Sequence, residues 1–340
     1  MTTPFFPTDC WYAVATSSQV THQPLPIRLL EQEILLRRIG ATDLIAHSAI
    51  CRHRRCHLKG AVVDADYHLT CPFHGWTYDA MGNCVEIPLL RSGEASPSGS
   101  NLRSFPVQEK NGLIWLWFSP DGQSPSYEVP VIAELEGLTL LPSTDIEYHF
   151  AANYTRTLEN ILDPTHAPFT HGSSVGKVDP QTDYTMEHYE VNHDQLGFTA
   201  QMPIKVKKIK GLTSLILDKN SDPYKEYRYI YPNVGISTIH FGKLTLCAIQ
   251  AHIPESEQST SVRLTNARNF LLKVPVITSW FDRVTIQTGT KICMEDEAII
   301  LDQVPVRSQF VGSNEVLVGS DSIIVAFRKY LKEKQILSAS

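Results

Sequence analysis

The sequence lacks a surplus of basic residues and has no long apolar stretch. Charged residues make up 19% of its 340 residues, and the formal net charge at pH 7 is −6. A nucleic-acid-binding protein usually carries a patch of lysine and arginine, so we expect no nucleic-acid partner. No stretch approaches the roughly 20 apolar residues that a transmembrane helix needs, so we expect no membrane span.

The sequence also lacks the features of a small secreted disulfide protein. Its seven cysteines are an odd number spread over a long chain, whereas such proteins use a dense and paired set. Residues 1–11 contain no basic region followed by an apolar run, so we expect no signal peptide. These absences favour a reducing, cytoplasmic environment.

The sequence does contain enough apolar side chains for a sizeable core, since 42% of its residues are hydrophobic. Short apolar runs such as 33–38 and 113–118 alternate with turn residues, which is typical of a small all-β domain. Prolines and glycines gather at 119–142 and indicate a domain edge. We therefore expect one domain at 1–130 and a second at 131–340.

The second domain is predicted to contain both strands and helices. Residues 184–201, 226–239 and 244–253 alternate between apolar and polar side chains, as strands do. Residues 291–303 and 321–334 have apolar side chains at helical spacing. The expected fold class is therefore α+β.

Two pairs of potential metal ligands lie in the first domain. Cys51 and His53 form one pair, and Cys71 and His74 form the other. Two cysteines and two histidines suit a tetrahedral zinc ion, but their order differs from that of a zinc finger. A Rieske [2Fe-2S] cluster uses this set, with two cysteines on one iron and two histidines on the other. We therefore favour the cluster over zinc.

A second group of potential ligands lies in the second domain. Asp163, His166 and His171 are close in sequence, and an acidic run at 295–297 follows much later. Two imidazoles and one carboxylate form the facial triad of non-haem Fe(II) oxygenases, although a zinc hydrolase can use a similar trio. Because a hydrolase has no use for a redox cluster in the same chain, we favour iron.

The spacing of these residues raises a geometric problem. Glu159, Asp163 and His166 would share one face of a helix, but His171 would lie roughly 140° away from His166. Pro168 lacks a backbone donor and would clash with the carbonyl four residues earlier. We therefore predict that the helix is distorted or ends between His166 and His171.

Both stretches resemble one known family. Segments 51–54 and 71–76 resemble the Rieske motif of the Rieske non-haem iron oxygenases, and 159–171 resembles their mononuclear iron motif. The latter is most similar to the chlorophyllide a and pheophorbide a oxygenase group, followed by vanillate demethylase-like enzymes. The resemblance implies an N-terminal all-β Rieske domain, with cluster loops at about 48–80. It also implies a catalytic domain whose antiparallel sheet is flanked by helices (helix-grip-like).

The resemblance also implies the metal ligands. Those of the [2Fe-2S] cluster would be Cys51, His53, Cys71 and His74. Those of a mononuclear Fe(II) would be His166, His171 and Asp296.

Further acidic and polar residues receive supporting roles from the same resemblance. Asp163 would act in catalysis by linking an iron-ligating histidine to His74 of the partner subunit. Asn160 would support the iron site through a hydrogen bond. Glu295 and Asp302 are the alternatives to Asp296 as the third ligand, and we otherwise expect Glu295 and Glu297 to be solvated.

The reaction implied by the resemblance is the O2-dependent oxidation of an organic, hydrophobic or aromatic ring substrate. Hydroxylation or oxidative demethylation is favoured, and dihydroxylation by a dioxygenase is the alternative. Electrons would come from NAD(P)H through a flavin reductase, a ferredoxin or both, and the chain would form a homotrimer. The alternative of another class is an electron-transfer Rieske protein without oxygenase activity.

The sequence departs from the family pattern in one cluster loop. Arg55 and Cys56 stand where glycine and alanine are usual. We expect Cys56 to fill a buried position, because free cysteine behaves as a small apolar residue. The one basic cluster, at 205–210, is interpreted as a solvated loop or face.

Overall fold

The computed structural model describes residues 6–91, 94–171, 189–203, 223–309 and 314–334. By its internal contacts the chain divides into two compact units. Thr8–Val129 forms one, and Met1–Pro7 with Pro130–Ser340 forms the other. The basic cluster at 205–210 lies outside the described residues.

The N-terminal unit is built from strands alone, apart from short 3-10 turns. One sheet has the order β1 (Cys10–Thr16), β10 (Leu113–Phe118) and β9 (Val107–Lys110). A second sheet consists of β2 (Leu25–Leu29), β3 (Gln32–Ile39) and β4 (Asp43–Ser48). The predicted all-β domain is therefore confirmed, including the apolar runs that become β3 and β10.

A third, small sheet carries the two cysteine–histidine loops. Its strands are β5 (Val62–Val63), β6 (Leu69–Thr70), β7 (Thr77–Tyr78) and β8 (Cys84–Glu86), in that order. The carboxylate of Asp79 accepts hydrogen bonds from the backbone N–H groups of Met81 and Asn83, both at 2.8 Å, and closes the turn between β7 and β8. Its strands are only two or three residues long, and most of this part of the chain forms the loops between them.

The larger unit contains a seven-stranded antiparallel sheet in the order β11-β17-β16-β15-β14-β13-β12. The strands are β11 (Thr139–Phe150), β12 (Val191–Asp194), β13 (Gly197–Pro203), β14 (Tyr224–Ile230), β15 (Val234–Phe241), β16 (Leu244–Ser256) and β17 (Ser259–Arg268). Three details differ from the prediction: the described part of 184–201 is divided into β12 and β13, 226–239 is divided into β14 and β15, and β17 was not predicted. Almost every residue of β17 is buried, polar ones included, so buried and exposed residues do not alternate along this strand.

The helices in the described part of this unit are α1 (Tyr154–Leu162), α2 (Ala167–Thr170), α4 (Pro275–Ile300) and α5 (Ser322–Glu333). Asn153 begins α1, because its side chain accepts a hydrogen bond from the Thr155 N–H at 3.1 Å. The two helices predicted near the C-terminus are confirmed as the last part of α4 and as α5. None of the helices in the described part of the chain is both long and apolar enough to cross a bilayer.

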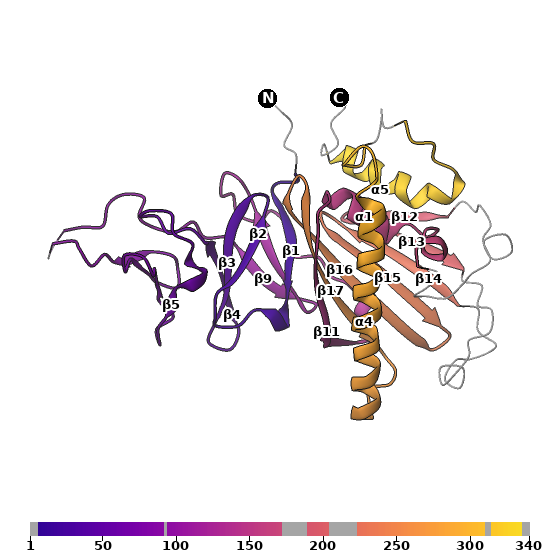
Figure 1. Ribbon diagram of the computed structural model, residues 1–340, viewed down its shortest axis with the longest axis horizontal. Coiled ribbons are helices and arrows are strands. Elements are labelled where there is room, and N and C mark those ends of the chain that lie inside the picture. Colours follow the sequence, from indigo (N-terminus) through magenta and orange to yellow (C-terminus); the bar gives the residue numbers. More distant parts are fainter. Residues whose placement is uncertain (1–5, 92–93, 172–188, 204–222, 310–313, 335–340) are drawn as a thin grey trace. The chain divides into compact units, whose positions relative to one another are not determined.

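Three helices cover the same face of the sheet (Figure 1). One row of paired residues crosses six strands and consists of Ile146, Leu264, Gln250, Gly235, Tyr229 and Phe198. A Cβ added to Gly289 of α4 would lie 2.8 Å from Ile146, and one added to Gly235 would lie 2.7 Å from Ile161 of α1. The Tyr229 ring contacts Phe327 of α5, with centroids 5.0 Å apart. Paired residues point to one face, so α1, α4 and α5 share it.

Candidate metal centres

The two loops of the N-terminal unit have the same backbone pattern. The Cys51 carbonyl accepts a hydrogen bond from the Arg55 N–H at 3.1 Å, and the Cys71 carbonyl accepts one from the Gly75 N–H at 3.0 Å. The donor residue is left-handed in both loops, with φ of 56° at Arg55 and 72° at Gly75. Each loop therefore folds back on its cysteine through a local turn.

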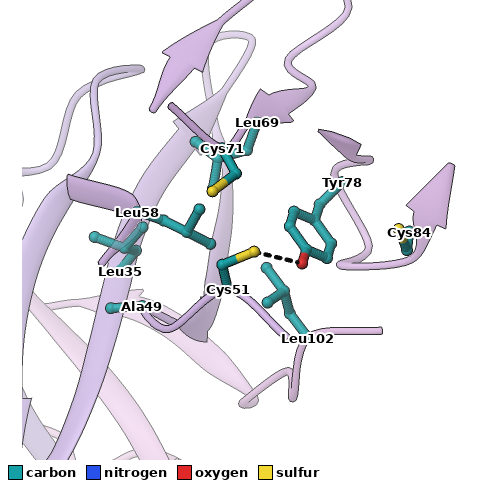
Figure 2. Close-up of a cluster of buried hydrophobic side chains, with 9 residues drawn as sticks. All are labelled: Leu35, Ala49, Cys51, Leu58, Leu69, Cys71, Tyr78, Cys84 and Leu102. Carbon is teal, nitrogen blue, oxygen red and sulfur yellow. Dashed lines mark hydrogen bonds between the residues drawn. The ribbon is translucent and has the colours of Figure 1, made fainter. Parts of the chain in front are cut away.

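The cysteines of these loops are buried in the core of the small sheet. Figure 2 shows the sulfur atoms of Cys51 and Cys71 among Leu35, Leu58 and other apolar side chains. The Cys51 sulfur lies 3.2 Å from the Tyr78 hydroxyl. Burial raises the pKa of the Cys51 thiol, and the Tyr78 contact acts in the opposite direction. The thiolate form that binds metal is therefore disfavoured until a cation replaces the proton.

The histidines of the same loops lie at the surface. The His53 and His74 rings have centroids 4.5 Å apart, and His53 stacks on Trp76 at 4.9 Å. Desolvation and the nearby charges of His53 and Arg54 lower the pKa of His74, which favours the neutral, metal-binding imidazole. Two buried thiols and two surface imidazoles fit a cluster in which one iron is enclosed and the other faces outward.

In the larger unit, the chain between α1 and α2 is broken earlier than predicted. Asp163 follows α1 in an extended conformation (φ −76°, ψ 119°), because Pro164 disfavours helix at the preceding residue. His166 begins α2 and His171 ends it. The interruption therefore lies before His166 and not between His166 and His171, so that prediction was wrong in its position.

The cause assigned to the interruption was also wrong. Pro168 lies in the first turn of α2, where a missing N–H removes no helical hydrogen bond. Glu159 does not share a helix face with Asp163 and His166. Its carboxylate is buried and accepts hydrogen bonds from Arg156 of α1 (2.9 Å) and Arg328 of α5. Glu159 therefore ties α1 to α5.

The break brings the two imidazoles together with a carboxylate of α4. His171 Nε2 lies 3.0 Å and His166 Nε2 lies 3.6 Å from the same oxygen of Asp296. One ligand atom from each of the three residues lies within 4.8 Å of the other two. The Asn160 side chain donates a hydrogen bond to Asp296 at 3.2 Å. Metal–ligand distances of about 2.0–2.2 Å fit a single ion between these atoms.

Asp163 lies beside the first imidazole. One of its oxygens accepts hydrogen bonds from the Thr165 N–H (2.7 Å) and hydroxyl (2.8 Å). The other oxygen is 3.7 Å from His166 Nδ1, and the Asp163 carbonyl oxygen is 3.2 Å from the same nitrogen. The residue is therefore placed to hold the His166 ring with Nε2 toward Asp296.

Glu295 and Glu297, expected to be solvated, both have partners in the structure. A Glu295 oxygen lies 2.9 Å from His171 Nδ1. Glu297 accepts hydrogen bonds from the Tyr148 hydroxyl (2.7 Å) and the Ala151 N–H (3.1 Å), which fastens α4 to the end of β11. The solvation prediction was wrong, because consecutive acids on a helix face different neighbours.

The other alternative to Asp296, Asp302, is exposed beyond the end of α4 and is absent from the cluster of ligand-type residues.

The sequence matches two family models that together cover most of the chain. Residues 10–106 match the Rieske [2Fe-2S] domain, and residues 150–335 match the vanillate O-demethylase oxygenase C-terminal domain. The chain belongs to the Rieske oxygenase family. The predicted fold and the predicted class of function are therefore confirmed.

Several Rieske oxygenase relatives show how far this similarity extends. The dicamba O-demethylase oxygenase component of Stenotrophomonas maltophilia is 24% identical over 98% of this chain and 99% of that protein. A putative toluene-4-sulfonate monooxygenase iron-sulfur subunit of Comamonas testosteroni is 32% identical over 49% of this chain, and the match spans about half of that protein (47%). Chlorophyllide a oxygenase of Oryza sativa is 30% identical over 49% of this chain and 29% of that protein.

Among solved structures, a NdmA QL mutant with caffeine from Pseudomonas putida CBB5 has a TM-score of 0.75 at 21% identity. The match covers 96% of this chain and 90% of that one. At this identity the likeness shows the Rieske oxygenase fold.

The two imidazoles of this Rieske oxygenase differ in electrostatic setting. Burial lowers the pKa of both rings. At His166 burial outweighs the carboxylates of Asp163 and Asp296, so the pKa is lowered. At His171 the hydrogen bonds to Asp296 and Glu295 outweigh burial, so the pKa is raised. Without a metal ion, His171 is therefore the ring that more readily holds a proton.

One residue near the centre was missed by the sequence analysis. Lys225 of β14 is half-buried. Burial lowers the pKa of its ammonium group, and the negative charges of Asp163 and Asp296 act in the opposite direction. Its position in an alternating strand was a usable signal, because Lys225 shares its face with the apolar rings of Tyr227 and Tyr229. A charged lysine on the covered face of a sheet is unusual, because burying a charge costs free energy unless the charge is paired.

Proposed function

We propose that this protein is the terminal component of a Rieske oxygenase and holds one [2Fe-2S] cluster and one Fe(II) ion in each chain. The observation that carries the proposal is the convergence of His166, His171 and Asp296 on one point. It occurs in a chain whose other unit presents two buried cysteines beside two surface histidines. A simple electron carrier would need only the cysteine–histidine site and not the second group of ligands.

The residues divide the work between the two centres. Cys51, Cys71, His53 and His74 would hold the cluster, which supplies single electrons. His166, His171 and Asp296 would hold the iron, which supplies the activation of dioxygen and leaves positions open for O2 and substrate. Asn160 holds the Asp296 carboxylate, and Asp163 holds the His166 ring.

Asp163 is also proposed to link the two centres in a homotrimer. His74 is partly exposed at the surface of its unit, so it can meet another copy of the chain. The carboxylate of Asp163 would accept a hydrogen bond from His74 of the partner subunit while it orients His166. Such a contact fixes both rings and joins the two metal sites.

The proposed reaction is monooxygenation of an aromatic ring compound, as hydroxylation or oxidative demethylation. Support comes from the relative named as a dicamba O-demethylase, which the chain matches over nearly its whole length. Electrons would reach the cluster from a flavin reductase, a ferredoxin or both. A dihydroxylating reaction is the alternative outcome of the same site.

Metal analysis and one variant test this function. We expect about three irons and two acid-labile sulfides per chain. Asp163→Asn should keep all of them, yet lose about 100-fold in substrate-coupled O2 uptake, because it removes a charge that orients a ligand. Asp302→Asn is the matched control, since Asp302 is exposed and has no place in the site.

Two results would contradict the proposal. A chain that binds cluster iron alone, under conditions that load a known oxygenase, would favour the electron-transfer alternative. An Asp163→Asn variant with full coupled activity would remove the linking role from Asp163 and leave the rest of the assignment standing.

A further inference from the structure

Four charged side chains form one arginine–glutamate group in the larger unit. Arg156 and Glu159 lie one turn apart on α1, and Arg328 lies on α5. These three side chains are almost fully buried. The fourth, Glu315, comes from the chain before α5 and is partly exposed. Two positive and two negative charges balance, so the group as a whole is neutral.

Both guanidinium groups bind both carboxylates. Arg156 Nη1 lies 2.9 Å from a Glu159 oxygen and 3.0 Å from a Glu315 oxygen. Arg328 donates from Nε to one oxygen of Glu159 and from Nη2 to the other, the second at 3.2 Å. Its Nη1 donates to Glu315. Glu159 is therefore gripped on both oxygens by the forked pair of donors of Arg328, and on one of them by Arg156 as well.

The two arginines also bind the backbone of the chain that follows α4. Arg156 Nε and Nη2 both donate to the Pro305 carbonyl, at 3.2 and 2.8 Å. Arg328 Nη1 donates to the Gln309 carbonyl at 3.1 Å. The group therefore fixes α1 against α5 and against the segment after α4.

Stability alone does not account for this group. Buried ion pairs often contribute no more to stability than apolar side chains of the same size would. What an arginine adds is direction, because its planar donors accept a carboxylate in one orientation. α1 has nine residues and is too short for its own hydrogen bonds to hold it in place. The arginine–glutamate group therefore specifies where α1 lies.

The position of α1 in turn affects the candidate iron site. Asn160 follows Glu159 directly, and its side chain donates a hydrogen bond to Asp296 at 3.2 Å. Asp163 ends the same helix, and one of its carboxylate oxygens lies 3.7 Å from His166 Nδ1. A displacement of α1 would therefore move the contacts of two of the three candidate iron ligands together.

We propose that Glu159 and Arg328 are positioning residues for the iron site. Their two-point contact fixes α1, and α1 places Asn160 and Asp163 beside the ligands that they hold. This inference rests on the proposed oxygenase function and adds to it residues that touch neither the metal nor the substrate. Arg156 completes the attachment from the α1 side.

The main variant is Arg328→Lys, which keeps the charge and loses the planar pair of donors. Its matched control is Arg268→Lys, because Arg268 is fully buried and its Nη2 lies 2.7 Å from Asp282 of α4. Asp282 lies about 21 Å along the helix from Asp296, so this second ion pair is remote from the ligands. A further variant combines Glu159→Gln with Arg328→Met. It removes one charge of each sign and leaves no buried charge unbalanced.

The full-length proteins are titrated with Fe(II) and, separately, with Co(II). Electron paramagnetic resonance of the Co(II) complex and of the Fe(II)–nitric oxide complex reports the ligand geometry, and urea unfolding reports stability. Both Arg328 variants should bind each metal ion about tenfold more weakly and should show shifted resonances. Arg268→Lys should lose stability with unchanged metal affinity and unchanged spectra.

Two results would overturn the positioning role. Unchanged metal affinity and spectra in both Arg328 variants, at lower stability, would leave the group with a structural role only. An equal loss of metal affinity in Arg268→Lys would show that the loss follows from lower stability and not from the position of α1.

Co(II) separates this proposal from the proposed function, because its binding requires the ligands but no reaction with O2. If only the Arg328 variants lose Co(II) affinity, in a protein that holds no iron and consumes no O2, the oxygenase function alone is overturned. Normal iron content and O2 uptake in every variant would overturn the positioning role alone. A protein that binds neither ion would overturn both.

Discussion

The two candidate metal centres are built in opposite ways. The proposed cluster ligands come from two short loops, each closed by a hydrogen bond to its own cysteine carbonyl. The proposed ligands of the iron site come from the two ends of α2 and from α4, which are far apart in sequence and lie together in the larger unit. A local motif therefore specifies the first centre, whereas tertiary packing specifies the second.

This difference extends to the core beneath each centre. Cys51 and Cys71 are members of the apolar core of the small sheet, so the ligands and the core are the same residues. Beneath the iron site, α4 packs on β11 and β17 through Phe150, Val262 and Ile300, none of which is a ligand. The cluster unit should depend on its metal for structure, and the catalytic unit should not.

The largest effects are expected when one proposed ligand is removed from each centre. Cys71→Ala should lose the cluster and open the strands around it, because it removes a ligand from within a core. His166→Ala should lose about one iron per chain and all turnover, with an unchanged fold. Iron and sulfide analysis, with hydrogen exchange of the β6 and β7 amides, measures both outcomes.

The comparison fails if the two variants behave alike. Rapid exchange throughout β14–β17 in His166→Ala would show that the iron site also supports the fold. Normal protection of β6 and β7 in Cys71→Ala would show that the small sheet is stable without its cluster.

The same contrast explains which parts of the molecule could be predicted. The cluster loops, the turn at Asp79 and the helix α5 follow from local spacing, and so did the choice of His166 and His171 as candidates. The pairing of Glu295 with His171 depends on how α4 is placed against α2, which no local pattern contains. The start of α4 was missed because its first half is mostly exposed yet rich in valine and isoleucine, so it has no amphipathic stripe.

The second prediction concerns acid stability, since each unit buries one histidine away from its metal ligands. The pKa of His47 in β4 is lowered to about 4 by burial and by Arg37, and that of His252 in β16 to about 3 by burial. Each unfolded ring takes up a proton near pH 6.5, whereas the folded ring stays neutral. Stability is therefore fully present above pH 6.5 and falls by about 1.4 kcal/mol per pH unit below it.

The loss should end near pH 4 for His47 and extend to about pH 3 for His252. Substitution by asparagine removes the titration, and at His252 it can keep a hydrogen bond to Thr157. Hydrogen exchange of β4 and β16 amides, corrected for intrinsic rates, follows each unit separately. An unchanged pH slope for β16 in His252→Asn would assign the acid sensitivity to other groups.

The third prediction tests whether neighbouring acids of α4 have different roles. Glu295→Gln weakens a charge-assisted contact to His171 and should weaken Fe(II) binding about tenfold. Glu297→Gln should leave Fe(II) affinity unchanged and lower stability by about 1 kcal/mol, because it weakens the contacts with Tyr148 and Ala151. Fe(II) titration and urea unfolding of both variants measure the split, and equal effects on Fe(II) affinity would contradict it.

The smallest expected effect distinguishes the two cluster loops from each other. Arg55 and Gly75 hold equivalent left-handed positions, and a Cβ added to Gly75 would lie 3.0 Å from Pro88. Arg55→Gly relieves about 1 kcal/mol of backbone strain, yet it also frees the unfolded chain by about 0.5–1 kcal/mol. The net change in stability should therefore be under about 0.5 kcal/mol.

Gly75→Ala has no such compensation, because it adds both strain and the contact with Pro88, so it should destabilise the unit by about 1 kcal/mol or more. Thermal loss of the cluster absorbance measures both variants. If Arg55→Gly stabilised the unit by as much as Gly75→Ala destabilises it, the backbone at Arg55 would be strained in the folded protein without compensation. The predicted near-zero change means instead that an exposed left-handed turn can accept arginine in place of glycine at almost no cost in stability.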